Sequence, residues 1–310
     1  MEGKKGTVCV TGGTGYIGSW LIWRLLDHGY SVRTTIRSNS AEHKKDLSFL
    51  TSLPGASEKL KILEADLGDP ESFRAAIEGC IGVFHVATPT DFDEAMEVVI
   101  KRTLDGAKGI LKACLDSKTV KKLVYTSSAS AVGLIDKNLD EVDETVWSDM
   151  DYVKALNPPG VPYVISKTLT ERAVLEFSEK HGFEVVTLVP SLVVGPFICP
   201  KFAGSVQFTL GLLSDDVARA HIFLFEHPEA KGRYNCSSNA ITVVSASRLL
   251  SSKYPELRAH AEDSAKVTSR LKLLPCLSTK KLKGSGFEFK YGVEEMLDDA
   301  VKCCKEKGYL

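Results

Sequence analysis

Short apolar runs alternate with amphipathic stretches along the first 126 residues of the chain. The apolar, β-branched runs predict strands at residues 7–11, 31–36, 60–64, 81–86 and 120–126. Large apolar residues at helical spacing predict helices between them, at residues 16–28, 41–51, 70–78 and 93–116. The third helix opens on Asp69-Pro70, a typical N-cap followed by proline. Such alternation predicts an α/β fold, a doubly wound parallel sheet with helices on both faces.

Beyond residue 126 the predicted elements are spaced more widely. A long amphipathic helix contains Tyr163 and runs to about Lys180, and a strand follows from Val185 to Val189. The later sequence indicates a helix near residues 204–213, a segment from 215 to 226, a strand at 231–236 and a terminal helix at 292–307. We expect these later elements to form a small lobe that is interleaved with the sheet.

A glycine-rich turn joins the first predicted strand to the first predicted helix. Its sequence is Gly12-Gly13-Thr14-Gly15-Tyr16-Ile17-Gly18. Gly12 can turn where a side chain would clash, Gly15 lets the backbone approach a pyrophosphate, and Gly18 lets the helix pack closely on the strand. The free N–H groups of the helix's first turn then face the phosphates. A glycine triplet alone can be a mere turn, but its place between strand and helix predicts a dinucleotide site.

The charge balance excludes some classes of partner. The 310 residues include 39 Lys+Arg and 40 Asp+Glu, which leaves no net field that favours nucleic acid or an anionic membrane. The expected partner is therefore a small molecule. No apolar run is long enough to span a membrane, and a strand begins soon after Met1 with no room for a signal peptide. We therefore expect a cytoplasmic location.

The eight cysteines are scattered, with no Cys-x-x-Cys pair and no histidine at zinc-ligand spacing. We expect reduced thiols and no metal site. The vicinal pair Cys303-Cys304 leaves a redox role open beside a structural one.

Three segments at predicted strand ends are candidates for contact with the cofactor. Arg37 follows the second strand, with Lys44 a turn or two later, where an enzyme that prefers NAD would place an acidic residue. A cation there favours a 2′-phosphate, although arginine and lysine also solvate ordinary loops. Asp66-Leu67 ends the third strand, and the aspartate suits an adenine contact or a turn equally well. Val86-Ala87-Thr88 places small residues after the fourth strand, and we interpret His85 before them as structural.

A hydroxyl, a phenol and an ammonium group supply candidate chemistry. Ser128 lies in a hydroxyl-rich run after the fifth strand, at the sheet edge where open α/β sheets bind ligands. Tyr163 and Lys167 are four residues apart, so a helix presents both on one face. We expect the ammonium to lower the pKa of the phenol from its free value of ~10 toward neutral pH. Tyr163 would then act as general acid on a carbonyl oxygen that Ser128 holds in place.

The glycine loop, Ser128 and the Tyr163/Lys167 pair resemble the extended short-chain dehydrogenase/reductase family. Further segments resemble its plant dihydroflavonol reductase branch, so that the resemblance covers nearly the whole chain: Val32–Arg37, Leu53–Ala56, Asp143–Asp149 and Phe287–Tyr291. It implies NADPH/NADP as cofactor and Ser128, Tyr163 and Lys167 as catalytic residues. The cofactor shell that it implies consists of Gly12, Gly13, Thr14, Gly15, Tyr16, Ile17, Arg37, Lys44, Asp66, Leu67, Val86, Ala87, Thr88, Tyr163, Lys167, Pro190 and Ser205.

The same resemblance implies a division of the chain and a reaction. Residues 1–196 would form the dinucleotide-binding domain that carries the catalytic residues, and residues 197–310 mainly the substrate-binding lobe. The implied reaction is reduction of a flavonoid or isoflavonoid-type ketone to the alcohol. Gly133 stands where dihydroflavonol reductases usually have an asparagine, and Gly160-Val161-Pro162 lacks the cinnamoyl-CoA reductase signature, which disfavours those two substrates. A nucleotide-sugar epimerase or dehydratase is the alternative enzyme, although it normally has an acidic residue in place of Arg37.

The chain departs from the family pattern just before Asp215-Asp216-Val217. Relatives usually place a loop and a strand of more than a dozen residues there. A missing strand would leave backbone groups of its neighbours unpaired, at about 1–3 kcal/mol each. Part of the substrate pocket would be lost with it. A further alternative is therefore an NADPH-binding protein with impaired or no catalysis.

Overall fold

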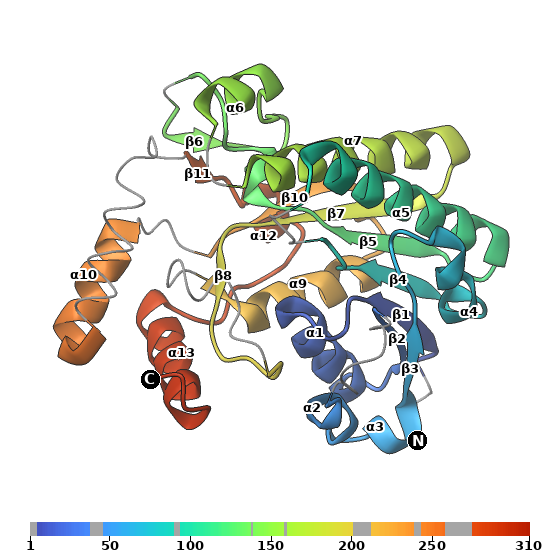
Figure 1. Ribbon diagram of the computed structural model, residues 1–310, viewed down its shortest axis with the longest axis horizontal. Coiled ribbons are helices and arrows are strands. Elements are labelled where there is room, and N and C mark those ends of the chain that lie inside the picture. Colours follow the sequence, from blue (N-terminus) through green and yellow to red (C-terminus); the bar gives the residue numbers. More distant parts are fainter. Residues whose placement is uncertain are drawn as a thin grey trace.

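Seven parallel strands form the central sheet, in the order β10-β7-β5-β4-β1-β2-β3 (Figure 1). The computed structural model describes residues 5–37, 46–89, 94–137, 139–157, 160–200, 212–238, 243–257 and 275–310. The strands are β1 (Thr7–Thr11), β2 (Ser31–Ile36), β3 (Leu60–Glu64), β4 (Gly82–His85), β5 (Lys122–Thr126), β7 (Glu184–Pro190) and β10 (Gly232–Cys236). The chain winds outward from β1 in both directions, which confirms the predicted doubly wound sheet. The direction of winding switches between β1 and β4, and doubly wound sheets bind their ligands in a crevice at the carboxyl ends of the strands at such a switch.

Helices cover both faces of this sheet (Figure 1). On one face α1 (Tyr16–Asp27) packs against α9 (Ser214–Glu226). On the other face α5 (Met96–Ser117) packs against α7 (Val161–His181) and against η1 (Pro70–Phe73) and α4 (Arg74–Ile77). The α5 sequence buries Thr103, Ala107, Ile110 and Cys114, a helical spacing that turns one stripe toward the sheet. The apolar core therefore consists of two layers, one on each face of the sheet.

Shorter elements frame the carboxyl edge of the sheet and the later part of the chain. They include η2, which follows β5, and α13, which packs on β8 and β9. Their bounds are α2 (Ser48–Thr51), α3 (Ala56–Lys59), η2 (Ala129–Ala131), β6 (Glu141–Val142), α6 (Met150–Leu156), β8 (Val193–Val194), β9 (Leu212–Leu213), α10 (Val243–Lys253), η3 (Pro255–Leu257), β11 (Cys276–Leu277), α12 (Lys280–Gly284) and α13 (Val293–Glu306).

Several predicted helices differ from the observed elements. The predicted helix at 70–78 begins as a 3₁₀ turn, and the Asp69 side chain makes no capping hydrogen bond; its backbone carbonyl accepts from the Ser72 N–H at 3.0 Å instead. Of the helix predicted at 41–51, residues 41–45 lie outside the described part, and only Ser48–Thr51 is helical. The helix predicted to begin at residue 93 begins at Met96. Propensity locates the ends of such short segments poorly because tertiary contacts decide them.

The segment before Asp215 also differs from expectation. The helix predicted near 204–213 is wrong at its described end, since Leu212–Leu213 forms strand β9, paired in parallel with Val193–Val194 of β8. Two apolar residues fit a strand or a helix equally well, and the available partner strand decides. A two-residue strand therefore lies directly before α9, and β8 has a partner along both of its residues.

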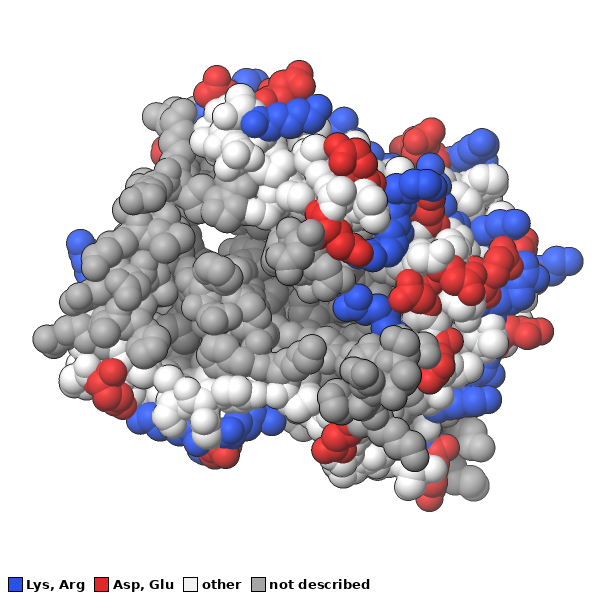
Figure 2. Space-filling model, in the orientation of Figure 1, with Lys and Arg blue, Asp and Glu red and all other residues white. Residues whose placement is uncertain are grey.

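Charge and cysteine placement agree with the composition. Figure 2 shows Lys and Arg interspersed with Asp and Glu over the described parts of the face in view, without a large patch of one sign. All eight cysteines are free, as predicted, and seven of them are buried. Cys303 and Cys304 pack with Phe197 and Cys199, which is an apolar environment. Within the described ranges, no helix is both long enough and apolar enough to cross a membrane.

Candidate active site

The glycine loop leaves β1 at the central switch point of the sheet. Gly12 has φ +75°, and a Cβ on it would lie 2.9 Å from the Cα of Ala87 beyond β4, so the predicted role of Gly12 in the turn is confirmed. Gly15 is exposed, and among the described residues beyond its chain neighbours only the Gly12 carbonyl oxygen, at 3.3 Å, would lie within 4 Å of an added Cβ. A Cβ on Gly18 would lie 2.3 Å from that same oxygen. Gly18 therefore brings α1 close to the loop itself rather than to the strand.

Gly13 has a packing role that the sequence did not reveal. Its N–H donates to the Thr35 carbonyl at 3.0 Å and fastens the loop to β2. A Cβ on Gly13 would lie 2.1 Å from the Thr34 Oγ1, whose hydroxyl donates to the Val10 carbonyl. Farther along the loop, the Tyr16 hydroxyl donates to the Gly195 carbonyl at 3.0 Å. These bonds fix the conformation of the loop, and Gly15 remains exposed.

Thr11 aligns the ends of β1 and β4, and sequence reasoning missed it. Its buried Oγ1 accepts from the backbone N–H groups of Val86 and Ala87, at 3.1 Å each. The same oxygen lies 2.9 Å from the His85 Nδ1. These three hydrogen bonds to the Thr11 hydroxyl fix the start of the Val86–Thr88 segment beside the glycine loop. The sequence predicted that this segment lies there. A hydroxyl at the last position of a strand is the signal that could have identified this link.

Buried hydroxyls without partners gather at the same edge. Thr88 follows β4, Ser130 follows β5 and Ser191 follows β7, and each has a buried hydroxyl without a hydrogen-bond partner among the described atoms. Unsatisfied buried polar atoms are costly, so native proteins rarely keep them unless a ligand or water supplies the partner. Together with the glycine loop, these hydroxyls fit a polar ligand that spans β1, β4, β5 and β7.

The other predicted cofactor residues that the structure describes follow β2 and β3 or end β7. Arg37 is the exposed residue directly after β2, two positions beyond the Thr35 carbonyl that holds the glycine loop. Asp66 accepts from the Gly68 N–H at 2.7 Å, which is the turn arrangement that the sequence left open. Leu67 is buried, and a Cβ on Gly106 would lie 2.6 Å from its side chain, so Leu67 packs in the core. Pro190 ends β7, and Lys44 and Ser205 lie outside the described residues.

Ser128, Tyr163 and Lys167 meet at the carboxyl end of β5. Ser128 caps η2 by accepting from the Ser130 N–H at 3.2 Å, and its hydroxyl is near enough to the Tyr163 phenol to lower the pKa of that phenol. Lys167 is 2% exposed and its Nζ donates to the Thr126 carbonyl at 2.6 Å. The Nζ lies 5.9 Å from the centre of the Tyr163 ring. The α7 helix thus presents phenol and ammonium on one face, as the spacing of four predicted.

The structure reverses the expected pKa relation of this pair. Burial raises the pKa of Tyr163, and the hydrogen bond from Ser128 offsets only part of the rise. Burial lowers the pKa of Lys167 to about 7, although the charge of Glu171 opposes this shift. The expectation that Lys167 brings the phenol pKa toward neutrality is therefore wrong here, because desolvation is the largest cause of the shift in both groups. Tyr163 is protonated at neutral pH, which is the form that a general acid needs.

Two histidines, His85 and His221, are buried near Ser128, Tyr163 and Lys167. Burial lowers the pKa of His85 to about 3 and that of His221 to about 4, so both rings are neutral. His221 Nε2 lies 2.7 Å from the Thr126 Oγ1, and its Nδ1 lies 2.7 Å from the Val217 carbonyl oxygen. The carbonyl can only accept, so Nδ1 carries the proton and Nε2 accepts from the threonine. The interpretation of His85 as a structural histidine agrees with its bond to Thr11.

We expect acid to destabilise the protein through these histidines. Their pKa values are far below the unfolded value of about 6.5, so the unfolded chain takes up protons first as the pH falls. Their contribution is complete above pH ~6.5 and decreases toward pH ~4, by about 2 kcal/mol for each histidine at pH ~5. Urea denaturation of His221→Gln should therefore show a smaller loss of stability between about pH 7.5 and pH 5 than the parent.

The exposed His181 at the end of α7 supplies the matched control. His181→Gln should retain the full pH dependence of the parent. Equal losses of stability in His221→Gln and in the parent would mean that the fold does not hold His221 in its neutral form.

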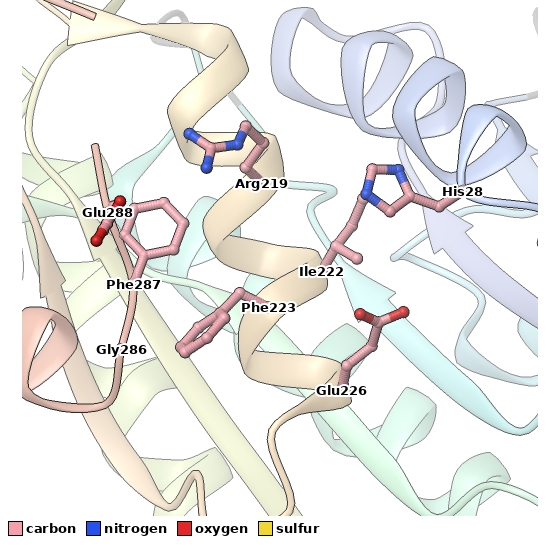
Figure 3. Close-up of a pocket in the computed structure, with 8 residues that line it drawn as sticks. All are labelled: His28, Arg219, Ile222, Phe223, Glu226, Gly286, Phe287 and Glu288. Carbon is pink, nitrogen blue, oxygen red and sulfur yellow. The ribbon is translucent and has the colours of Figure 1, made fainter. Parts of the chain in front are cut away.

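A hollow of about 310 Å³ lies away from this constellation (Figure 3). It is bounded by His28 at the end of α1, by Arg219 and Glu226 on the outer side of α9, and by the segment 286–288. Its walls mix both signs of charge, and it contains none of the predicted catalytic residues. Within the described ranges no cluster of three or more His, Cys, Asp or Glu could hold a metal ion.

Comparison with known proteins agrees with this geometry. Residues 8–210 match the model of the NAD dependent epimerase/dehydratase family. Vestitone reductase of Medicago sativa is 53% identical over the whole of both chains, and a dihydroflavonol 4-reductase of Callistephus chinensis is 42% identical over 100% of this chain and 89% of its own. The crystal structure of the alfalfa vestitone reductase superposes with a TM-score of 0.85 at 51% identity, covering 99% of this chain and 100% of that one.

A more distant solved structure shares the fold. Gre2 of Candida albicans in complex with NADPH has a TM-score of 0.80 at 25% identity, over 97% of this chain and 99% of its own. The alignment with vestitone reductase spans 328 positions against the 310 residues of this chain, so the relative has residues that this chain lacks. The resemblance to dihydroflavonol reductase relatives, and to vestitone reductase among them, is confirmed. The family model and these full-length matches, together with the glycine loop and the meeting of Ser128, Tyr163 and Lys167, show that the chain belongs to the NAD dependent epimerase/dehydratase family.

Proposed function

We propose that this protein reduces a flavonoid or isoflavonoid-type ketone to the alcohol, with NADPH as hydride donor. The observation that carries the proposal is the meeting of Ser128, Tyr163 and Lys167 at the same edge of the sheet as the glycine loop, in a chain 53% identical to a vestitone reductase. The relatives named as reductases of flavonoid ketones support the substrate class, and the Gre2 complex supports NADPH. A cytoplasmic location and a plant source belong to the same proposal.

The residues of the site suit each part of this reaction. The N–H groups of the first turn of α1, opened by Gly15, would hold the pyrophosphate, and Arg37 the 2′-phosphate. When bound, NADPH supplies the hydride to the carbonyl carbon. The Tyr163 hydroxyl gives its proton to the carbonyl oxygen, which the Ser128 hydroxyl holds by a hydrogen bond. The Lys167 ammonium stabilises the phenolate that Tyr163 leaves behind. Residues beyond Pro196 would mainly enclose the substrate, apart from α9 and β10, which complete the central fold.

The test is NADPH consumption by the purified protein against a panel of flavanones, isoflavanones and dihydroflavonols, with chiral analysis of the alcohols. We expect turnover of at least one ketone class and none with nucleotide sugars. Turnover of a nucleotide sugar without net NADPH consumption would instead assign an epimerase. Tight NADPH binding without turnover of any ketone would assign a cofactor-binding protein.

The cofactor preference should depend on Arg37. Arg37→Asp should shift the ratio of NADPH to NADH affinity by at least about tenfold toward NADH, because an acidic residue repels the 2′-phosphate and favours the ribose hydroxyls. Titration of each cofactor by fluorescence measures the ratio directly. Arg33→Asp is a control on the same strand, since that side chain donates to the Glu78 carbonyl on the outer edge. An unchanged ratio in Arg37→Asp would make Arg37 an ordinary surface residue.

The shortened substrate side leads to a second expectation. A family-length segment inserted before β9, between Gly211 and Leu212, should raise turnover because it encloses more of the substrate. We place it there because Asp215 in the first turn of α9 accepts from Trp20 Nε1 at 3.0 Å and from Arg24 Nε, a contact that an insertion after Ser214 would break. The affinity for NADPH should stay the same, because the cofactor residues lie earlier in the chain.

The melting temperature is the informative companion measurement. Since β9 already pairs with β8, the inserted segment should add little stability, contrary to what a missing strand would imply. If the parent turns over its ketone as fast as the lengthened protein, the pocket does not need the segment.

A further inference from the structure

A buried ion pair lies one helical turn below the catalytic lysine. Glu171 on α7 is fully buried and Arg233 on β10 is 6% exposed. The guanidinium meets the carboxylate with two bonds, from Nε to Oε1 at 3.0 Å and from Nη2 to Oε2 at 3.1 Å. The Glu171 carboxylate also accepts from the hydroxyls of Ser127, at 2.7 Å, and Thr187, at 2.6 Å. Four bonds therefore fix this side chain, two from Arg233 on β10, one from Thr187 on β7 and one from Ser127, the residue after β5.

The arginine extends the network to the turn that carries Ser128. Its Nη1 donates to the carbonyls of Glu144, at 2.9 Å, and Val146, at 2.7 Å. Its Nη2 reaches the Ala131 carbonyl at 3.5 Å, at the end of η2, and its guanidinium lies 3.5 Å from the centre of the Trp147 ring. The Ser127 hydroxyl that Glu171 holds belongs to the residue next to Ser128. The ion pair thus fastens both ends of the segment from 127 to 131.

The same carboxylate supplies charge to Lys167. The two residues are four apart on α7, which places them on one face of the helix. The other described groups that face Lys167 are uncharged at neutral pH: Tyr163 on α7, Tyr125 on β5, His85 on β4 and His221 on α9. Burial moves the pKa of Lys167 to about 7, and Glu171 is the neighbour whose charge raises it. With a pKa of about 7, Lys167 is protonated in only about half of the molecules at neutral pH. The charge of Glu171 therefore decides what fraction of Lys167 is protonated.

We infer that Glu171, fixed by Arg233, is a positioning residue of the proposed reductase site: its carboxylate is the counter-charge of Lys167 and, through Ser127, it anchors the turn that carries Ser128. The inference rests on the proposed function, because it assigns Lys167 and Ser128 to that reaction. Glu171 itself lies behind the constellation and touches no reacting atom. A purely structural ion pair would hold the sheet and helix together but would leave the titration of Lys167 unchanged.

The experiment is NMR of protein labelled with ¹³C at the lysine ε-carbon, with the Lys167 signal assigned by Lys167→Arg. In the parent, Lys167 should titrate near pH 7. In Glu171→Gln, Lys167 should titrate about one pH unit lower. Glu176→Gln is the matched control, since the same change is made at an exposed position on the same helix. If Lys167 titrates at the same pH in Glu171→Gln and in the parent, the inference is overturned, whatever the turnover of either protein.

A second pair of variants separates charge from folding. Glu171→Gln leaves Arg233 buried without its partner, so Glu171→Gln/Arg233→Met removes both charges and should fold while the Lys167 titration stays low. Arg233→Met alone keeps the carboxylate, and its Lys167 titration should not fall below that of the parent. With an active ketone, the alkaline limit of kcat/KM should move down by about one pH unit in both variants that lack the carboxylate. Absence of ketone turnover in the parent would refute the proposed function, whereas the NMR result would still decide the charge role.

Discussion

Tyr163→Phe should lower kcat by at least about a hundredfold while NADPH binds with unchanged affinity, because a general acid contributes roughly 10²- to 10⁴-fold to a rate. The phenylalanine ring fills the same place on α7, but the proton that the carbonyl oxygen needs is gone. The raised pKa of Tyr163 keeps the parent phenol protonated at neutral pH, so the acid is fully available before reaction. Single-turnover kinetics with saturating NADPH measure the loss at the chemical step.

Tyr30→Phe is the matched control for this variant. Tyr30 is 4% exposed and its hydroxyl donates to Glu226 at 2.8 Å, but it precedes β2, at the edge of the sheet opposite the crevice. This substitution also removes a buried phenolic hydroxyl, and it should leave kcat unchanged. Retention of most of the parent rate in Tyr163→Phe would remove Tyr163 from the role of general acid and would leave the proton donor unassigned.

Arg233→Met should lower the free energy of unfolding by about 3–5 kcal/mol, which is the usual result of removing one partner of a buried ion pair. The variant leaves the Glu171 carboxylate at 0% exposure with only the hydroxyls of Ser127 and Thr187 to solvate it. Two backbone carbonyls, at Glu144 and Val146, lose their donor as well. Urea denaturation at neutral pH gives the difference.

The double variant Glu171→Leu/Arg233→Met should recover at least half of that loss, because neither charge of the ion pair then stays buried without the other. Lys5→Met provides the comparison at an exposed pair, since Lys5 and Glu226 have side chains 42% and 38% exposed and water screens them. Its loss should be far smaller than that of Arg233→Met. Similar losses for both single variants would show that burial does not strengthen the Glu171–Arg233 pair.

The order of strands and helices could be predicted from the sequence, because each element has its own characteristic spacing of apolar residues. β1, β2 and β3 have the bounds that the sequence predicted, and the spacing of Tyr163 and Lys167 placed them on one face of α7. The glycine loop was equally local, since a turn between a strand and a helix is defined by consecutive residues. These features need no information from distant parts of the chain.

Properties that depend on several strands at once were decided only in the tertiary structure. From the sequence we expected Lys167 to lower the pKa of Tyr163. Burial between sheet and helix instead raises the pKa of Tyr163 and lowers that of Lys167. Local sequence gives no measure of that burial. The pairing of Leu212–Leu213 with β8 likewise depends on a strand that is remote in sequence.

The same reason explains the residues that sequence reasoning missed. The role of Thr11 depends on the N–H groups of Val86 and Ala87 after β4, from which it accepts, and the role of Gly13 depends on the Thr34 side chain on β2. Glu171 and Arg233 are 62 residues apart, and in sequence each is an ordinary charged residue on a helix or strand. The sequence by itself determined the fold class and the glycine loop and placed Tyr163 and Lys167 on one helix face, because those are local patterns. Packing of the seven-stranded sheet decided which charges lose water and which partners they meet, and desolvation then set the chemistry of the site.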